Sequence, residues 1–239
     1  MLLDRLLASA PAERLVSGLV RAWSSASARR LDRRVALRRL LSLDELLQER
    51  VDALAAGLDD GVHAKHRLMR YHDFFVDRIE SHESVLDVGC GKGELAHDIA
   101  ERAHATVTGI DWNAGSLAFA RSRFDDVEFV EADVLAWEPP KHYDVVVLSN
   151  VLEHIAPRVE LLSRLREAAK PSRMMIRVPS RERDWLVPLR AELGLPHLSD
   201  PTHEIEYTRE ELEQELRASG LTPVEVQQRW GELWVVADA

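Results

Sequence analysis

The sequence predicts a doubly wound α/β sheet preceded by a helical appendage, and three observations predict it. From Ser84 onward, short apolar runs alternate with helical segments. The apolar runs are continuous rather than alternating, as expected for parallel strands covered by helices on both faces. Three of the runs end at an acidic residue. Because right-handed crossovers bring the carboxyl ends of parallel strands to one edge, we expect these acids to lie along that edge.

The first 61 residues are expected to form the appendage, with the fold that follows spanning residues 62–239. Helices are predicted over Met1–Ala8, Ala12–Trp23 and Arg29–Leu58, with Ser24–Ser27 as a polar joint. The segment is rich in arginine, and a solvated helix face is the simplest explanation. One alternative is an arm that contacts an anionic partner or a membrane surface. Another is an arm that forms a homodimer. The arginines are Arg29, Arg30, Arg33, Arg34, Arg38 and Arg39.

A glycine-bounded segment, Gly57–Gly61, marks the boundary between the two parts. One helix is then predicted over His63–Glu80, with an apolar face made by Leu68, Tyr71, Phe75 and Ile79.

The sheet region follows in regular order. Strands are predicted at Val85–Val88, Thr106–Ile110, Val127–Val130, Tyr143–Leu148 and Met174–Val178. The helices between them are predicted at Glu94–Ala103, Ala114–Phe124 and Pro157–Ala169. This alternation is typical of a parallel sheet.

The end of the chain has a different pattern. A helix is predicted over Thr208–Ser219, where Thr208 and Glu211 form a capping box and Gly220 stops the helix. Two more strands are predicted after it, at Val224–Gln228 and Leu233–Val236.

Composition limits the function classes. The chain has 239 residues, 46% of them hydrophobic and 30% charged, with a net charge of −10. The negative charge argues against a broad nucleic-acid interface, and no nucleic-acid partner is expected. The single cysteine, Cys90, indicates a reducing compartment. No apolar run approaches the ~20 residues of a membrane span, and Asp4 and Arg5 argue against a secretory signal. We therefore expect a cytoplasmic protein.

The segment from Ser84 to Leu95 combines a strand, a glycine-rich turn and the start of a helix. The strand stops at Asp87, and three alternate glycines follow. Glycine is used where backbone approaches a ligand closely or takes a positive φ. Such a turn after a parallel strand is a nucleotide-binding position. Asp111 ends the apolar run Ala105–Ile110, and Asp133 follows the run Val127–Val130.

This set of motifs resembles the class I S-adenosylmethionine-dependent methyltransferases, from about Val62 to the C-terminus. The resemblance implies a Rossmann-like, seven-stranded, mostly parallel sheet with a C-terminal antiparallel hairpin. It also implies S-adenosyl-L-methionine as the cofactor and methylation as the reaction.

The resemblance assigns each part of the cofactor to residues of this chain. The backbone of Gly89, Gly91 and Gly93 would pass against the methionine end, and Asp87 and Asn150 would face its ammonium group. Asp111 can accept both ribose hydroxyls, and Trp112 beside it belongs to the same site. Asp133 and Val134 would contact the adenine. Cys90 is expected to pack in the loop, because no neighbouring base prepares it as a nucleophile.

The segment from Leu148 to Ile155 resembles the small-molecule methyltransferases, including O-methyltransferases of quinone biosynthesis and enzymes that modify sugars. His154 is the candidate general base, because an unperturbed histidine titrates near neutral pH; packing or helix capping is the alternative. Glu153 and His203 would assist or orient it. Some quinone-branch enzymes hold a divalent metal here, but Asn150 replaces their first acidic ligand, and no metal is expected.

Two further segments are expected near the acceptor. The segment between the fifth strand and Thr208 would cover the reacting end, and the helix before Ser84 would close over the methionine end. The candidate residues in the first are Arg181, Arg183, Trp185, Arg190, His197, His203, Glu204 and Tyr207. Those in the second are His66, Arg67, Tyr71 and His72.

The sequence thus predicts a methyltransferase that acts on a small molecule, most simply at a hydroxyl oxygen of a sugar, glycolipid precursor or isoprenoid-like acceptor. A regulatory protein that binds the cofactor without chemistry is the alternative from another class. A nicotinamide-dependent oxidoreductase is a third reading, but its third glycine should stand where this chain has Glu94.

Overall fold

The computed structural model describes residues 10–55, 58 and 64–239. The chain forms two compact units. The hairpin unit comprises Met1–His63 with Pro188–His197, and the sheet unit comprises Ala64–Val187 with Leu198–Ala239. The predicted helix Met1–Ala8, and the boundary Gly57–Gly61 apart from Leu58, lie outside the described residues.

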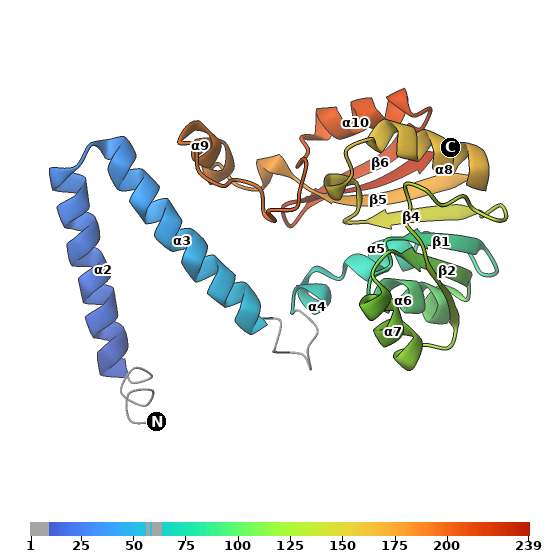
Figure 1. The fold of residues 1–239 in the computed structure, drawn as a ribbon, viewed down its shortest axis with the longest axis horizontal. Coiled ribbons are helices and arrows are strands. Elements are labelled where there is room, and N and C mark those ends of the chain that lie inside the picture. The colour runs from blue at the N-terminus through green and yellow to red at the C-terminus, as the bar shows by residue number, and fades with distance from the viewer. Residues whose placement is uncertain (1–9, 56–57, 59–63) are drawn as a thin grey trace. The chain divides into compact units, whose positions relative to one another are not determined.

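The hairpin unit contains two long helices, α2 (Ala10–Arg30) and α3 (Arg33–Ala55) (Figure 1). The predicted joint at Ser24–Ser27 is wrong, because α2 continues through it. Ser24 Oγ donates to the carbonyl of Arg21 at 3.0 Å, so its hydroxyl is satisfied within the helix. The break comes later, where the Asp32 carboxylate accepts the Arg34 amide at 2.8 Å and starts α3.

The segment after the boundary is also broken where the sequence predicts one helix. It forms α4 (Lys65–Met69) and α5 (Tyr71–Val76), separated by Arg70 with a left-handed φ of 51°. Tyr71 and the predicted apolar residues after it are buried, but Leu68 is 62% exposed. The predicted apolar face is therefore wrong at Leu68, because the break at Arg70 changes the direction of the chain.

The sheet has seven strands in the order β3-β2-β1-β4-β5-β7-β6, which confirms the predicted fold class. Strands β1 to β5 are parallel, whereas β7 pairs antiparallel with both β5 and β6. Their bounds are β1 Ser84–Val88, β2 Thr106–Asp111, β3 Val127–Glu131, β4 Val145–Ser149, β5 Arg173–Pro179, β6 Thr222–Arg229 and β7 Glu232–Asp238. The order reverses between β1 and β4, the position where open α/β sheets bind ligands.

Helices cover both faces of the sheet (Figure 1). On one face, α5, α6 (Glu94–Ala103) and α7 (Ala114–Arg123) pack on alternate strand residues such as Val85. On the other face, α8 (Arg158–Ala169) and α10 (Arg209–Ala218) pack on Leu86 and Val88. Since strand side chains alternate, Asp87 shares the Val85 face, toward α5 and α6.

Local sequence signals determine several helix ends. The predicted capping box is present, because Glu211 N donates to Thr208 Oγ1 at 3.2 Å and Thr208 N donates to Glu211 Oε2 at 2.9 Å. Three short elements were not expected from the sequence. They are the 3₁₀ turns η1 (Leu152–His154) and η2 (Arg181–Arg183) and the helix α9 (Leu186–Glu192). No helix in the described part of the chain is long and apolar enough to span a membrane.

Candidate functional site

A cavity of about 650 Å³ lies at the carboxyl ends of the parallel strands. It brings together seven of the predicted site residues, and Ile110, Val151 and Ile155 supply apolar lining beside them. We call it the large cavity. The predicted residues that line it are Gly89, Asp111, Trp112, Asp133, Val134, Asn150 and His154.

A second cavity of about 230 Å³, the small cavity, shares Gly89 and Asn150 with the first. Its lining is strongly charged and includes the predicted Asp87 as well as Glu94, Lys65 and Arg177. His66 and Tyr71 also line it, as expected for the segment before β1. The arrangement can bind a ligand that carries both charges.

The glycine-rich turn shapes the rim that the two cavities share. Gly89, Gly91 and Gly93 have left-handed φ values of 69°, 55° and 82°. A Cβ at Gly89 would lie 2.6 Å from Val151 Cγ2, and one at Gly93 would lie 2.6 Å from Phe129 Cζ. Of the three, Gly89 alone lines the cavities. Gly91 and Gly93 supply two of the left-handed φ values that the turn requires.

Asp111 connects the turn to the end of β2. Its Oδ2 accepts the Gly91 amide at 2.9 Å, and its Oδ1 accepts the Asn113 amide at 2.8 Å. Asp133 is held similarly, because its Oδ1 accepts the Leu135 amide at 2.9 Å. Trp112 is 76% exposed and leaves a large aromatic face beside the cavity.

Asp87 is buried with an unsatisfied carboxylate. Its Oδ2 has no hydrogen-bond partner among the described residues, and the same is true of Asn150 Oδ1. Burial, and then the negative charge of Asp111, raise the pKa of Asp87 to about 8. Burial also raises the pKa of the Cys90 thiol, which packs against Gly109. A cationic ligand group would satisfy Asp87, whereas Cys90 has the surroundings of a packing residue.

Arg177 is a site residue that the sequence analysis missed. It is buried, and its guanidinium donates to both carboxylate oxygens of Glu232 at 2.6 Å. It also lies 3.7 Å from the ring centre of Tyr71. The available signal was a single charge inside the apolar run of β5, which requires a partner when it is buried.

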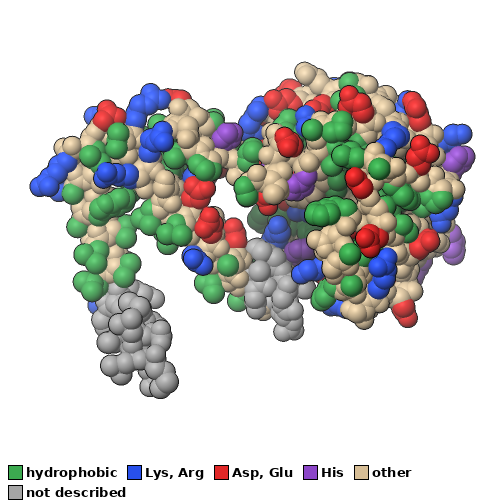
Figure 2. Space-filling view, in the orientation of Figure 1, with side chains coloured by type: hydrophobic (Ala, Val, Ile, Leu, Met, Phe, Trp, Pro, Cys, Tyr) green, Lys and Arg blue, Asp and Glu red, His purple; other side chains and the backbone are tan. Residues whose placement is uncertain are grey.

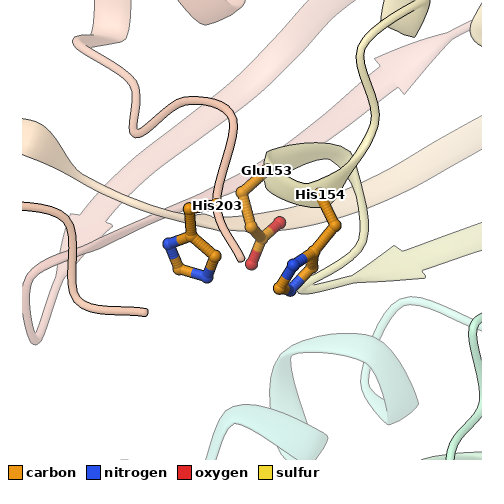
Figure 3. Close-up of side chains that lie close together, drawn as sticks. All are labelled: Glu153, His154 and His203. Atoms are coloured by element: carbon orange, nitrogen blue, oxygen red, sulfur yellow. The ribbon is translucent and has the colours of Figure 1, made fainter. Parts of the chain in front are cut away.

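Glu153, His154 and His203, which the sequence predicts at the reacting end, lie close together, and we call them the acceptor cluster (Figure 3). The Glu153 side chain is fully buried, and neither carboxylate oxygen has a hydrogen-bond partner among the described residues. Burial raises the pKa of Glu153 to about 8. The carboxyl lies between the two imidazoles, whose centres are 4.7 Å apart at an interplanar angle of 74° (Figure 3).

Backbone hydrogen bonds hold the two halves of the cluster together. The Glu204 amide donates to the Glu153 carbonyl at 2.7 Å, which fastens the segment after Leu198 onto η1. The predicted residue Glu204 thus contributes its backbone, and His203 is placed beside His154.

Each histidine has a polar partner at Nδ1. His154 Nδ1 lies 3.0 Å from Thr202 Oγ1, which donates to Asp200 Oδ1 at 2.6 Å. His203 Nδ1 lies 3.2 Å from Glu206 Oε1. Hydrogen bonds from Thr202 lower the pKa of Asp200, and burial lowers the pKa of His203. The sequence pattern does not reveal the roles of Asp200, Thr202 and Glu206, because their contacts depend on the loop conformation.

Other residues of the predicted cover lie in different surroundings. The Tyr207 hydroxyl donates to Glu215 Oε2 at 2.8 Å, and Arg181 forms an ion pair with Glu211. Arg190 binds the Leu41 carbonyl and Asp44 within the hairpin unit, to which His197 also belongs. His72, on α5, pairs with Asp98. Among the described residues, these side chains do not line the large cavity.

Comparisons with known proteins place this geometry among enzymes of one type. A family model described as a methyltransferase domain matches residues 62–226. Trans-aconitate 2-methyltransferase of Escherichia coli is 32% identical over 112 residues, which cover 46% of this chain and 43% of the relative. The match thus spans less than half of that relative.

Two solved structures illustrate the likeness of fold. The putative methyltransferase in complex with the Haloferax volcanii Trm112 activator gives a TM-score of 0.61 at 18% identity, over 79% of this chain and 96% of that one. Magnesium protoporphyrin IX methyltransferase from Synechocystis PCC 6803, solved with bound SAH, gives 0.57 at 16% identity, over 73% and 82%.

Proposed function

Because the chain belongs to the class I S-adenosylmethionine-dependent methyltransferases, we propose that it methylates a hydroxyl oxygen of a small-molecule acceptor. The observation that carries the proposal is that His154 lines the same cavity as Asp111 and Asp133. A proton acceptor and the residues expected to hold the methyl donor therefore share one space.

The residues present fit S-adenosylmethionine, the methyl donor typical of this family. Asp87 Oδ2 and Asn150 Oδ1 are buried acceptors without a partner among the described residues, which suits an ammonium group. The absence of a side chain at Gly89 leaves room at the rim common to the two cavities. Asp111 would hold the ribose diol, and the remaining predicted residues of the large cavity would hold the adenine: Trp112, Asp133 and Val134.

The chemistry of the protein in this proposal is alignment and proton removal. When bound, the cofactor supplies a methyl group activated by the sulfonium. Holding an acceptor in line with it can contribute roughly 7–11 kcal/mol to lowering the barrier. A ring nitrogen of His154 takes the hydroxyl proton, and a positioned base of this kind contributes about 10²–10⁴-fold in rate. Glu153 or His203 assists or orients His154.

The cavity and the relatives support the proposed acceptor class. The apolar lining suits an acceptor with hydrocarbon surface, whereas the acceptor cluster suits a hydroxyl group. Trans-aconitate 2-methyltransferase acts on a small molecule, as its name states. We propose a sugar, glycolipid precursor or isoprenoid-like alcohol.

Acceptor screening with labelled cofactor tests the proposal. Once a substrate is found, His154→Ala should lower turnover by about 10²-fold or more and leave cofactor affinity nearly unchanged. Full activity of the variant would assign His154 to packing and leave His203 as the next candidate. If no acceptor is methylated although S-adenosylmethionine raises the melting temperature, the regulatory alternative is favoured. Stabilisation by a nicotinamide cofactor instead would contradict the proposal.

One observation supports a metal-assisted variant of the same reaction. Glu153, His154 and His203 offer ligand atoms that lie within 4.8 Å of one another. Two imidazoles and a carboxylate are a ligand set that divalent metals accept. Loss of activity on chelation, restored by magnesium or zinc, would support the variant; activity that survives chelation would exclude it.

We further propose that the hairpin unit contacts an anionic membrane surface, and that the protein is cytoplasmic. Exposed apolar side chains lie along α2 and α3, with basic ones near the turn (Figure 2). The exposed apolar residues include Leu15, Leu19, Trp23, Leu47, Val51 and Leu54. Sedimentation with anionic but not neutral lipid vesicles should detect the contact. Binding to neither, with a dimer by light scattering, would favour the homodimer.

A further inference from the structure

The hydroxyl of Thr202 stands between an acid and a histidine. Thr202 Oγ1 lies 2.6 Å from Asp200 Oδ1 and 3.0 Å from His154 Nδ1. The Thr202 amide donates to the same Asp200 oxygen at 2.7 Å, so the Asp200 carboxylate is held against Thr202 by two hydrogen bonds. The three residues therefore form one chain of hydrogen bonds that ends at the imidazole.

The donor and acceptor of each hydrogen bond in this series follow from the protons that Asp200, Thr202 and His154 carry. An ionised carboxylate only accepts hydrogen bonds, so the single hydroxyl proton of Thr202 points to Asp200. Thr202 Oγ1 then has only lone pairs for His154, and the hydrogen of that contact must come from Nδ1. A neutral imidazole has one donor nitrogen and one acceptor nitrogen. Its other nitrogen, Nε2, is left with the lone pair.

We propose that Asp200, acting through Thr202, is a positioning residue that holds His154 with its proton on Nδ1 and the lone pair of Nε2 available to an acceptor. His154 and Thr202 both line the large cavity. The inference rests on the proposed function for its catalytic meaning, because a lone pair on Nε2 is what a general base needs. The tautomer itself does not depend on any acceptor.

Glu206 acts on His203 in the same way. Glu206 is buried and accepts from the Ser199 amide and from Arg183, so its carboxylate is ionised and faces His203 Nδ1 as an acceptor. Both histidines thus present Nε2 as the unprotonated nitrogen. Two separate carboxylates are used for this, Asp200 indirectly and Glu206 directly.

Nuclear magnetic resonance of the full chain, labelled with ¹⁵N and free of cofactor and acceptor, tests the proposal. At about pH 8, long-range ¹H–¹⁵N spectra distinguish the protonated from the unprotonated ring nitrogen of a neutral imidazole. The His154 signals are identified by their absence in His154→Gln. We expect a protonated Nδ1 and an unprotonated Nε2. The reverse pattern in the unaltered protein would overturn the proposal without any variant.

Variants then test the role of Asp200. Thr202→Val removes the hydroxyl, and Asp200→Ala frees the hydroxyl proton to point at the ring, so both should move the His154 proton toward Nε2. Thr202→Ser keeps the hydroxyl and should keep the original tautomer. Asp184→Ala removes an acid from a similar turn, where it accepts the Leu186 amide, and should change nothing at His154. An unchanged tautomer in both Thr202→Val and Asp200→Ala would also overturn the proposal.

Failure here is distinguishable from failure of the proposed function. The expected tautomer in a chain that methylates no acceptor would refute the reaction alone. Methyl transfer by a chain whose His154 carries its proton on Nε2 would refute the positioning role alone.

Discussion

At the proposed cofactor end of the site, Asp111 is the last residue of a parallel strand, and Gly89 and Asp133 follow parallel strands within two residues. At the acceptor end, His154 precedes α8 and β5 along the chain, and His203 follows them. The first group is placed by backbone pairing in the sheet, and the second by contacts between side chains and loops. The difference teaches that backbone changes should affect the cofactor end most, whereas side-chain changes can alter the acceptor end separately.

The largest loss of stability is expected when a side chain is added to the glycine-rich turn. Gly89→Ala combines a left-handed φ with a contact of 2.6 Å to Val151. We expect it to lower the free energy of unfolding by about 2–4 kcal/mol and to weaken cofactor binding. Gly91→Ala is the matched control, since its φ is also left-handed but its Cβ would meet no atom within 4 Å. Urea unfolding measures both, and equal losses would contradict the role of the close approach.

A change to Asp111 should act mainly on binding. Asp111→Ala removes the charged acceptor proposed for the ribose diol, so cofactor affinity should fall by about 1–3 kcal/mol in calorimetry. His154→Ala should leave that affinity nearly unchanged, which is the comparison between the two ends. If Asp111→Ala binds the cofactor normally, the assignment of the cofactor end is wrong.

Asp87 should make stability depend on pH. Its folded-state pKa of about 8 lies above the unfolded value, so the folded protein binds the proton more tightly. The free energy of unfolding due to this group is therefore highest below about pH 4 and falls as the pH rises toward 8. Asp87→Asn removes this fall, so its stability relative to the unaltered protein should rise by up to about 1.4 kcal/mol per pH unit. Urea unfolding between pH 5 and 8 measures the difference, and a constant difference would contradict the burial argument.

The smallest effect is expected from removing the N-terminal helices. A chain that begins at Val62 keeps every residue that lines the two cavities, so its cofactor affinity should change by less than about 0.5 kcal/mol. Circular dichroism and calorimetry test this domain division. An unfolded product would show that the helices belong to the core.

Much of the sheet unit could be predicted because its signals are local. Continuous apolar runs specify buried parallel strands, and the Thr208–Glu211 capping box starts α10 as predicted. Two local features were missed. Ser24 Oγ donates to a carbonyl three residues earlier, so the serine does not end α2, and Arg70 has a left-handed φ that its residue type does not predict.

The sequence by itself determined the order of strands and helices and the acids at the strand ends, because strand period and glycine turns are properties of neighbouring residues. Only the tertiary structure decided the acceptor cluster. His203 lies beside Glu153 because the Glu204 amide donates to the Glu153 carbonyl. Asp200 acts on His154 through the Thr202 hydroxyl. These partners are far apart along the chain, and their contacts exist only once the sheet has brought the ends of β4 and β5 side by side.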